Sequence, residues 1–348
     1  MDKIQVLIVD DSAVVRSVLT GLLSAEPDIE VVGAAVDPYD ARKKIKQLRP
    51  DVLTLDIEMP KMDGITFLKN LMKLNPMPVV MLSSLTQDGA DATLQALEFG
   101  AVDYIAKPTA TDSDVALKLF QRELVSKIQM AAESAKKLKF MRSSGKQEKV
   151  TVQLDNIKLD NQIVAIGSSA GGTEALHKVI QQLPEVMPPI IVTQHIPASF
   201  SERFASRLNR SSVLKVVEAK NDDVLRPGYV YLAPGDSHLT IQQSGCEYVC
   251  RLDTGDKVNR HKPSVEVMFD SLLPLTPLNV TGVMLTGMGE DGAQAMKRLL
   301  DAGAFNIVQD EATSLVWGMP GAAVKAGAAS EIVPLHKIAQ RIVGHLSE

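Results

Sequence analysis

The sequence predicts a two-domain α/β protein in which each domain is built on a doubly wound, mostly parallel β-sheet. The chain has 348 residues, about twice the usual length of one domain. In both halves, short apolar runs alternate with segments of helical periodicity, which is typical of successive βα units. A charged segment with little to bury, at 136–149, separates the halves and indicates a solvated linker.

Composition excludes several classes of protein. Hydrophobic residues make up 45% of the chain, as in ordinary globular proteins, and 37 basic against 42 acidic residues give a net charge of −5. We therefore predict no nucleic acid partner. No apolar run reaches the roughly 18 residues of a membrane span, and the first residues lack a signal-peptide pattern. We expect a cytoplasmic protein that does not insert into membranes.

The two cysteines, Cys246 and Cys250, lie four residues apart in a segment with strand character. On one strand they would point to the same face and could not easily form a disulfide. We interpret both as buried thiols without a metal or redox role, because no Cys/His cluster accompanies them.

Five strands are expected in the first domain, residues 3–125, and each is followed by a helical segment or the linker. Polar side chains follow four of them, and the carboxyl ends of parallel strands meet at one edge of the sheet. The strands are expected at 4–9, 29–32, 52–55, 79–82 and 104–106, and the polar residues are Asp10, Asp11, Asp56, Ser83 and Lys107. Three converging carboxylates repel one another unless a cation lies among them, and Mg²⁺ prefers such ligands. The lysine would supply positive charge for a bound phosphoryl group.

An alternative is that these acids only cap helices, as Asp11 or Ser12 could. Capping does not explain two acids, a hydroxyl and a lysine at successive strand ends. The combination resembles the response-regulator receiver domain of two-component signalling. Met59-Pro60 and Asp63-Gly64 also match that family's loop after the acceptor, although a turn and a helix start would explain them as well.

The resemblance implies a role for each residue. Asp56 would accept a phosphoryl group from a phosphohistidine of a partner kinase. Asp10, Asp11, Asp56 and the backbone carbonyl of Glu58 would hold Mg²⁺, and Ser83 and Lys107 would contact phosphoryl oxygens. Tyr104 matches an aromatic residue that changes orientation on activation, although a role in the core explains it equally well.

The predicted linker covers 126–159. A helical rhythm over 113–138 runs on into a stretch that has six positive residues and one negative from 136 to 149. We interpret the linker as helical and then solvated, with binding to an acidic surface as the alternative.

The second domain is expected over 160–346. Pro-Gly pairs within 224–252 indicate hairpins attached to its sheet. The expected strands are 163–166, 190–192, 230–232, 280–285, 307–308 and 332–333, and the expected helices are 173–183, 200–208, 265–273, 292–302 and 335–346.

A candidate nucleophile follows the first of these strands. Residues 167–171 read Gly-Ser-Ser-Ala-Gly, which matches G-x-S-x-G on a strand-to-helix turn and exposes Ser169 at the positive end of a helix. The alternative is a phosphate-binding glycine loop, but G-x-G-x-x-G and a following lysine are missing.

A serine nucleophile needs a base and a group that orients the base. His195 follows strand 190–192 at the same sheet edge, whereas His238 and His261 lie in hairpin or loop segments and the others in helices. Asp291 follows strand 280–285 and is the best acid, although alone it could be a helix N-cap. The Gly235-Asp236-Ser237 run is better explained as a turn.

The order Ser169, His195, Asp291 differs from that of α/β-hydrolases. Together with the surrounding motifs it resembles the CheB family of chemotaxis protein-glutamate methylesterases, over residues 160–346. The motifs are Ala165-Ile166-Gly167, Gly171-Gly172-Thr173-Glu174, Thr193-Gln194-His195, Ala233-Pro234-Gly235-Asp236, Asn259-Arg260-His261-Lys262-Pro263-Ser264-Val265 and Leu285-Thr286-Gly287-Met288-Gly289. One departure is Ala170, where the family usually has Thr.

This second resemblance implies a receiver-regulated serine hydrolase. It would demethylate glutamate γ-methyl esters, and deamidate glutamines, on chemoreceptors, with a chemotaxis histidine kinase as phosphodonor. The resemblance points to the backbone N–H of Met288 as an oxyanion donor, with Ala170 the less secure choice, and to no cofactor for the esterase reaction beyond Mg²⁺ in the receiver. A second hypothesis is a regulator whose C-terminal half only binds a partner. A transcription factor is disfavoured because no basic recognition helix is evident.

Overall fold

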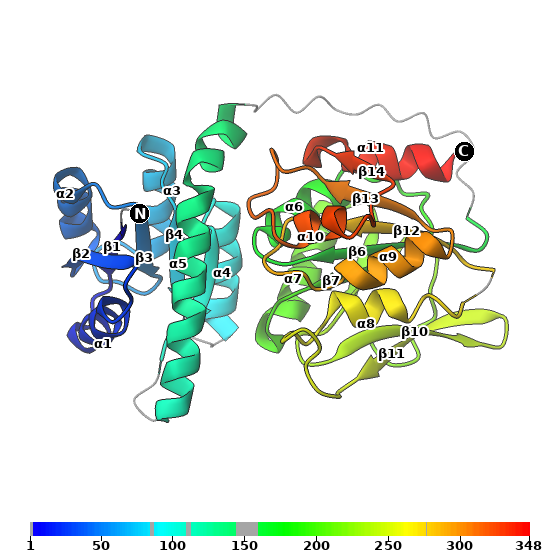
Figure 1. Ribbon diagram of the computed structural model, residues 1–348, viewed down its shortest axis with the longest axis horizontal. Helices are drawn as coiled ribbons and strands as arrows, with labels where there is room; N and C mark the ends of the chain where they lie inside the picture. The colour runs from blue at the N-terminus through cyan, green and yellow to red at the C-terminus, as the bar shows by residue number, and fades with distance from the viewer. Residues whose placement is uncertain (1–2, 84–86, 109–112, 144–158, 276) are drawn as a thin grey trace. The chain divides into compact units, whose positions relative to one another are not determined.

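The computed structural model describes residues 3–83, 87–108, 113–143, 159–275 and 277–348. The chain divides into two compact units, Met1–Gly145 and Lys146–Glu348 (Figure 1). Each unit has its own sheet and its own hydrophobic core. The predicted α/β class is confirmed for both. Among the described residues, no helix is both long and apolar enough to span a membrane.

The first unit is a five-stranded parallel sheet in the order β2-β1-β3-β4-β5. Helices α1 and α5 contact each other, as do α3 and α4. The strands are β1 (Ile4–Val9), β2 (Ile29–Ala35), β3 (Val52–Asp56), β4 (Val79–Ser83) and β5 (Asp103–Ala106), and the helices are α1 (Ala13–Ser24), α2 (Pro38–Leu48), α3 (Gly64–Leu74), α4 (Gln87–Glu98) and α5 (Asp114–Ser143). This strand order places the ends of β1, β3 and β4 side by side.

Helix capping in this unit leaves the strand-end acids available for chemistry. Ser12 is the N-cap of α1, and its hydroxyl accepts a hydrogen bond from the Val15 N–H at 3.4 Å. Asp37 and Asp63 cap α2 and α3. Asp11 is therefore not the cap of the first helix, and capping explains neither Asp10 nor Asp56.

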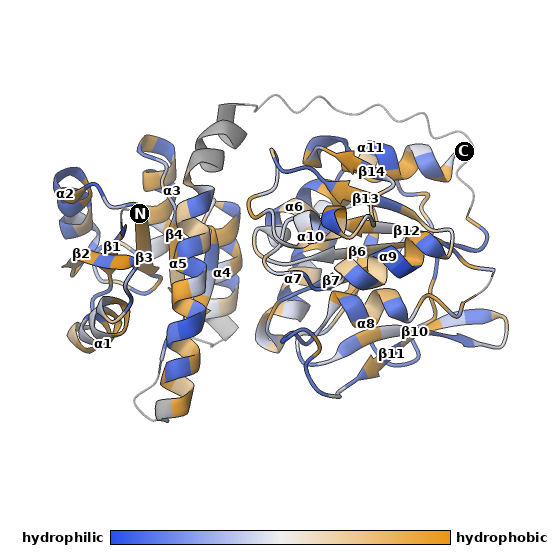
Figure 2. Cartoon of the chain, viewed as in Figure 1, coloured by the Kyte–Doolittle hydropathy of each residue, from blue (hydrophilic) through white to orange (hydrophobic). Residues whose placement is uncertain are grey.

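Helix α5 runs through the predicted boundary at 125 and on to Ser143. Hydrophobic and hydrophilic residues alternate along the coloured part of this helix (Figure 2). Leu124, Ile128 and Ala131 lie one helical turn apart and are fully buried, and α5 contacts β3, β4 and β5. This apolar face is the part of the helix that favours packing. The rest of the predicted linker, 144–158, lies outside the described residues.

The second unit is a seven-stranded sheet in the order β14-β13-β12-β6-β7-β9-β8, and every pairing in it is parallel. Helices α8, α9 and α10 pack together, and α6 contacts both α7 and α11. The strands are β6 (Gln162–Ser168), β7 (Ile190–Gln194), β8 (Lys215–Glu218), β9 (Tyr229–Leu232), β12 (Asn279–Met284), β13 (Phe305–Gln309) and β14 (Glu331–Val333). The helices are α6 (Gly172–Ile180), α7 (Ala198–Ser211), α8 (Val265–Asp270), α9 (Ala293–Asp301), α10 (Met319–Lys325) and α11 (Leu335–Leu346).

The antiparallel part is one hairpin, β10 (His238–Ser244) and β11 (Glu247–Asp253), which forms a separate two-stranded sheet. The hairpin packs against α8 (Figure 1). The Pro227-Gly228 turn does not make a second hairpin, because it leads into β9, which pairs in parallel with β8. Strand β8 and helix α10 are not among the elements expected from the sequence.

The prediction that both cysteines are buried on one strand is wrong for Cys246. Cys250 is buried in β11, but Cys246 is exposed in the turn between β10 and β11. A reversal of the chain at Gly245, with φ +62°, separates the two environments.

Candidate active site

The candidate nucleophile lies on the turn between β6 and α6. The Ser169 N–H donates to the Thr286 carbonyl at 3.1 Å, and the Ser169 carbonyl accepts from the Gly172 N–H at 2.7 Å. Gly171 has φ +73°, a conformation that glycine adopts without strain. Gly287 permits a close approach, because a Cβ there would lie 2.9 Å from Ser169 Cβ. The turn therefore holds Ser169 half-buried at the carboxyl edge of the sheet.

The neighbouring serine has a different environment. Ser168 is fully buried, and its hydroxyl donates to Gln194 Oε1 at 2.7 Å. Gln194 in turn donates from Nε2 to the carbonyls of Ser169, at 2.8 Å, and His195, at 3.3 Å. Ser168 and Gln194 thus link the ends of β6 and β7. Sequence reasoning missed Gln194, although it stands in the Thr193-Gln194-His195 motif.

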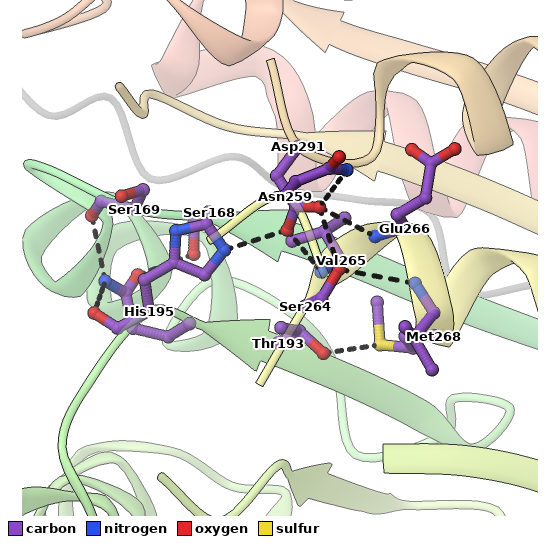
Figure 3. A network of polar contacts seen from close by, with 12 residues as sticks. Ser168, Ser169, Thr193, His195, Asn259, Ser264, Val265, Glu266, Met268 and Asp291 are labelled. Carbon is purple, nitrogen blue, oxygen red and sulfur yellow. Dashed lines mark hydrogen bonds and ion pairs between the residues drawn. The ribbon is translucent and has the colours of Figure 1, made fainter. Parts of the chain in front are cut away.

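The candidate base and acid are in direct contact. His195 Nε2 lies 2.9 Å from Asp291 Oδ2. In Figure 3 the imidazole lies between Ser169 and Asp291. The other nitrogen, Nδ1, is buried and has no hydrogen-bond partner in the described part of the chain. The structure therefore brings the three predicted residues to one place. His195 Nε2 contacts Asp291, and Nδ1 lies on the side of the ring that faces Ser169 (Figure 3).

Asp291 is almost fully buried and accepts hydrogen bonds from three elements. Besides His195, the donors are Asn259 Nδ2 (2.8 Å), Ser264 Oγ (2.8 Å) and the N–H groups of Val265 (2.6 Å) and Glu266 (3.4 Å). Burial alone would raise the pKa of this carboxyl, but the hydrogen bond and charge of His195, with the bonds from Asn259 and Ser264, lower it to about 2. Asp291 does not cap its own helix, because the N-cap of α9 is Gly292. Asp291 stays ionised and instead binds the first residues of α8.

The segment before α8 contributes residues that sequence reasoning treated as secondary. The His261 ring stacks on His195, with 3.7 Å between ring centroids and 7° between planes. Burial, and then the charge of His195, lower the pKa of His261 to about 4. His238 is buried as well, and its Nδ1 accepts from the Ser264 N–H at 3.1 Å. The Asn259 to Val265 motif was the available signal, but only the fold shows that it surrounds His195 and Asp291.

The predicted oxyanion donors lie on two loops beside Ser169. Ala170 follows the serine, and its carbonyl accepts from Thr286 Oγ1 at 3.0 Å. Met288 follows Gly287, whose carbonyl accepts from the Gly318 and Met319 N–H groups at 3.1 and 2.8 Å. These bonds hold the two loops together and define the wall of the site next to Ser169.

A second cluster lies at the strand ends of the first unit. Carboxylate oxygens of Asp10, Asp11 and Asp56 all lie within 4.8 Å of one another. Lys107 Nζ lies 3.0 Å from Asp10 Oδ2 and 2.7 Å from Asp56 Oδ2. Burial, and secondarily the Asp10 charge, raise the pKa of Asp56 to about 6 despite Lys107. Three carboxylates this close together repel one another and offer oxygen ligands, so they fit a divalent cation such as Mg²⁺.

The remaining predicted residues of this cluster lie around Asp56. The Glu58 N–H donates to Asp56 Oδ1 at 3.1 Å, which places the Glu58 backbone beside the Asp56 carboxylate. Ser83 is buried at the end of the adjacent strand, and its hydroxyl accepts from Thr93 Oγ1 at 2.7 Å. Tyr104 lies under Lys127, whose Nζ is 5.2 Å from the ring centroid. The Ser83 hydroxyl can donate to a phosphoryl oxygen while it still accepts from Thr93 of α4.

The two clusters define a class of protein: a receiver-type phosphoryl-acceptor unit joined to a unit with a serine, histidine and aspartate at one sheet edge. Comparison with known families agrees. The response regulator receiver domain matches residues 6–118, and the CheB methylesterase family matches residues 164–342. The chain belongs to the CheB methylesterase family and carries a receiver domain, so both resemblances are confirmed.

Relatives are similar over nearly the whole chain. The protein-glutamate methylesterase/protein-glutamine glutaminase 1 of Xanthomonas campestris pv. campestris is 52% identical, over 98% of this chain and 96% of the relative. A Saccharophagus degradans protein with the same double activity in its name is also 52% identical, over 99% of both chains. The crystal structure of the Thermotoga maritima CheB methylesterase catalytic domain covers 53% of this chain and 97% of its own, with 36% identity and a TM-score of 0.51.

Proposed function

We propose that the protein is a cytoplasmic, phosphorylation-regulated serine hydrolase that removes methyl groups from glutamate γ-esters on chemoreceptors and deamidates glutamines there. The observation that carries the proposal is the contact of His195 with the ionised Asp291 at the sheet edge that also bears Ser169. The double activity in the names of relatives at 52% identity supports the substrate class. In a chemotaxis pathway, this reaction would serve adaptation.

The contact of Asp291 with Nε2 determines which nitrogen acts as base. A carboxylate at 2.9 Å favours the tautomer with the proton on Nε2, so Nδ1 has the free lone pair. Nδ1 would take the proton of Ser169 Oγ as that oxygen attacks the ester carbonyl. Asp291 would stabilise the imidazolium that forms.

The tetrahedral oxyanion would be held by backbone N–H groups, for which we propose Met288 and, less directly, Ala170. The imidazolium would then give its proton to the departing methanol, or to ammonia when the substrate is a glutamine. Water, activated by the same histidine, would release glutamate from the acyl-enzyme on Ser169.

Regulation would begin at Asp56. Its carboxylate would attack the phosphohistidine of a chemotaxis kinase, and Ser83 and Lys107 would contact the new phosphoryl oxygens. Mg²⁺, held by Asp10, Asp11, Asp56 and the Glu58 carbonyl, would neutralise charge during the transfer. We propose no cofactor for the esterase reaction.

The deciding assay measures methanol release from methylated receptor membranes by the full chain with Mg²⁺, with and without a small-molecule phosphodonor. We expect release that rises with the phosphodonor. No release in either condition, with Asp56 shown to be phosphorylated, would favour a regulator that only binds its partner.

The two adjacent serines provide a matched pair of variants. Ser169→Ala should reduce turnover to background, since the nucleophile is lost. Ser168→Ala should retain turnover, because Ser168 Oγ is buried and bonded to Gln194. Unchanged turnover in Ser169→Ala would overturn the assignment.

A further inference from the structure

We propose that His261 is a positioning residue for the reaction at Ser169: its ring lies flat against His195 and keeps that imidazole turned with Nδ1 toward the serine. The proposal rests on the proposed function. It is carried by the stack itself, in which the ring centroids are 3.7 Å apart and the planes 7° from parallel.

The hydrogen bond to Asp291 cannot orient His195 by itself. A single contact at Nε2 fixes one edge of the ring, but the ring can still tilt about that contact. A tilt would move Nδ1 away from the serine, and proton transfer requires hydrogen-bond reach. The flat face of His261 blocks the tilt on one side and excludes water from that face.

His261 is well placed for this purpose because its own turn is rigid. The Val258 and His261 backbones pair through two hydrogen bonds, of 3.1 and 2.9 Å. Asn259 and Arg260 between them have φ of 50° and 71°, as in a type I′ turn. Asn259 and Ser264, on either side of His261, both donate to Asp291 Oδ1. The stacked ring and the catalytic acid are therefore held by the same short segment.

The stack also requires that only one of the two imidazoles carries charge. His195 would become cationic in each cycle, and a second cation 3.7 Å above it would oppose that step. Burial and the charges of His195, Lys257 and Arg260 lower the pKa of His261 to about 4, and Asp291 offsets them only in part. His261 thus stays neutral at neutral pH and leaves the proton to His195.

The test compares His261→Ala, which removes the stack, with His261→Phe, which keeps a flat uncharged ring, in the full chain. We expect kcat for methanol release to fall about 10- to 100-fold in His261→Ala, as for a misplaced catalytic group. KM should stay within about twofold, since no substrate contact is lost. His261→Phe should keep kcat within about threefold of the wild type. Thr254→Ala, at an exposed side chain of the same loop, is the control.

A second readout does not depend on turnover. In full-length protein labelled with ¹⁵N-histidine, the His195 signals should show one dominant tautomer, protonated at Nε2, in the wild type and in His261→Phe. They should broaden or mix in His261→Ala. This measurement also decides the matter if His261→Ala is poorly folded, because His261→Phe alone must then keep both the tautomer and the activity.

Several results would overturn the proposal. These are a His261→Ala kcat within twofold of the wild type, a loss confined to KM, or a His261→Phe variant as impaired as His261→Ala. Failure of the proposed function is seen separately, as unchanged turnover in Ser169→Ala. If Ser169→Ala is inactive and His261→Ala is not impaired, only the positioning role is wrong.

Discussion

At the scale of single residues, Asp291 is a buried carboxylate that hydrogen-bond donors keep ionised. Five side-chain or backbone donors surround its carboxylate, so the ionised form is favoured despite burial. The same bonds join β7, the segment before α8 and the start of α9. One side chain therefore orients the base and holds three elements in place.

Asp291→Asn tests this double role. The asparagine amide carries no charge and has one acceptor oxygen, so it cannot accept from His195 Nε2 and from all the other donors. His195 therefore loses its preferred tautomer. We expect kcat to fall about 10³-fold or more, as in other serine hydrolases that lose this carboxylate. Methanol release under saturating substrate measures the effect. Turnover within tenfold of the wild type would mean that another group orients His195.

The Asp291 pKa also predicts a pH dependence of stability. The folded-state pKa of about 2 lies below the ordinary 3.8, so this group stabilises the folded state above about pH 4 and loses that contribution as pH falls toward 2.

Ionisation of Asp56 changes the stability of the folded state in the opposite direction. Its folded-state pKa of about 6 lies above the ordinary 3.8, so the folded state holds the proton more tightly and the ionised form is destabilising above pH 6. At pH 7.5 without Mg²⁺, Asp56→Asn should stabilise the first unit by on the order of 1–3 kcal/mol, and the gain should vanish below about pH 4.

Hydrogen exchange of β3 peptides measures this gain for the first unit alone. Asp28→Asn, at an exposed carboxylate, is the control and should change little. Mg²⁺ should slow exchange more in the wild type than in Asp56→Asn. Faster β3 exchange in Asp56→Asn at pH 7.5 would contradict the prediction.

At the scale of elements, the exits of parallel strands build both sites. β6, β7 and β12 are neighbours in the sheet, and their pairing sets Ser168 opposite Gln194 and Gly167 opposite Met284. Ser169 and His195 follow directly after β6 and β7, and Asp291 lies in the loop after β12. The order of these strands therefore brings all three residues to one edge of the sheet. The loop after β12 then backs Ser169 through Gly287.

Gly287→Ala tests that close approach. A Cβ there would lie 2.4 Å from Met319 Sδ and 2.9 Å from Ser169 Cβ, so the turn bearing the serine must shift. We expect a loss of activity of about 100-fold, since small misplacements of reacting groups are costly, in a protein that still folds. Gly344→Ala in α11 is the control, because its Cβ would meet only Arg341 Nη1 at 3.5 Å and alanine favours a helix. Equal activities of the two variants would argue against the close packing at Ser169.

At the scale of the whole molecule, regulation requires that phosphorylation change the balance between two states of the full chain. We propose that the unphosphorylated receiver domain restricts access to the esterase site. A tenfold activation then requires a difference of about 1.4 kcal/mol between phosphorylated and unphosphorylated chains.

A fragment of residues 150–348 should therefore release methanol faster than the unphosphorylated full chain. The phosphodonor should raise the activity of the full chain but not of the fragment or of Asp56→Asn. If the fragment were no more active than the unphosphorylated full chain, steric inhibition would be excluded.

The sequence by itself determined the α/β class, the polar residues at the strand ends and both family resemblances. Alternating apolar runs and helical periods are local signals, and in parallel sheets they place strand-end residues at one edge. Strand β8, with only four residues, was not recognised in this way. A hairpin was expected within 224–252, but it forms its own sheet instead of joining the main one.

Only the tertiary structure decided which side chains at the sheet edge are buried and which contact one another. The motif favours Ser169 over Ser168, but only packing shows that Ser168 is buried against Gln194. In the sequence His261 is a loop histidine with no evident role, and only the structure shows that the turn at 258–261 places its ring on His195. These outcomes depend on contacts between separate segments, such as Ser168 and Gln194, which are 26 residues apart, and periodicity and turn motifs do not specify such contacts.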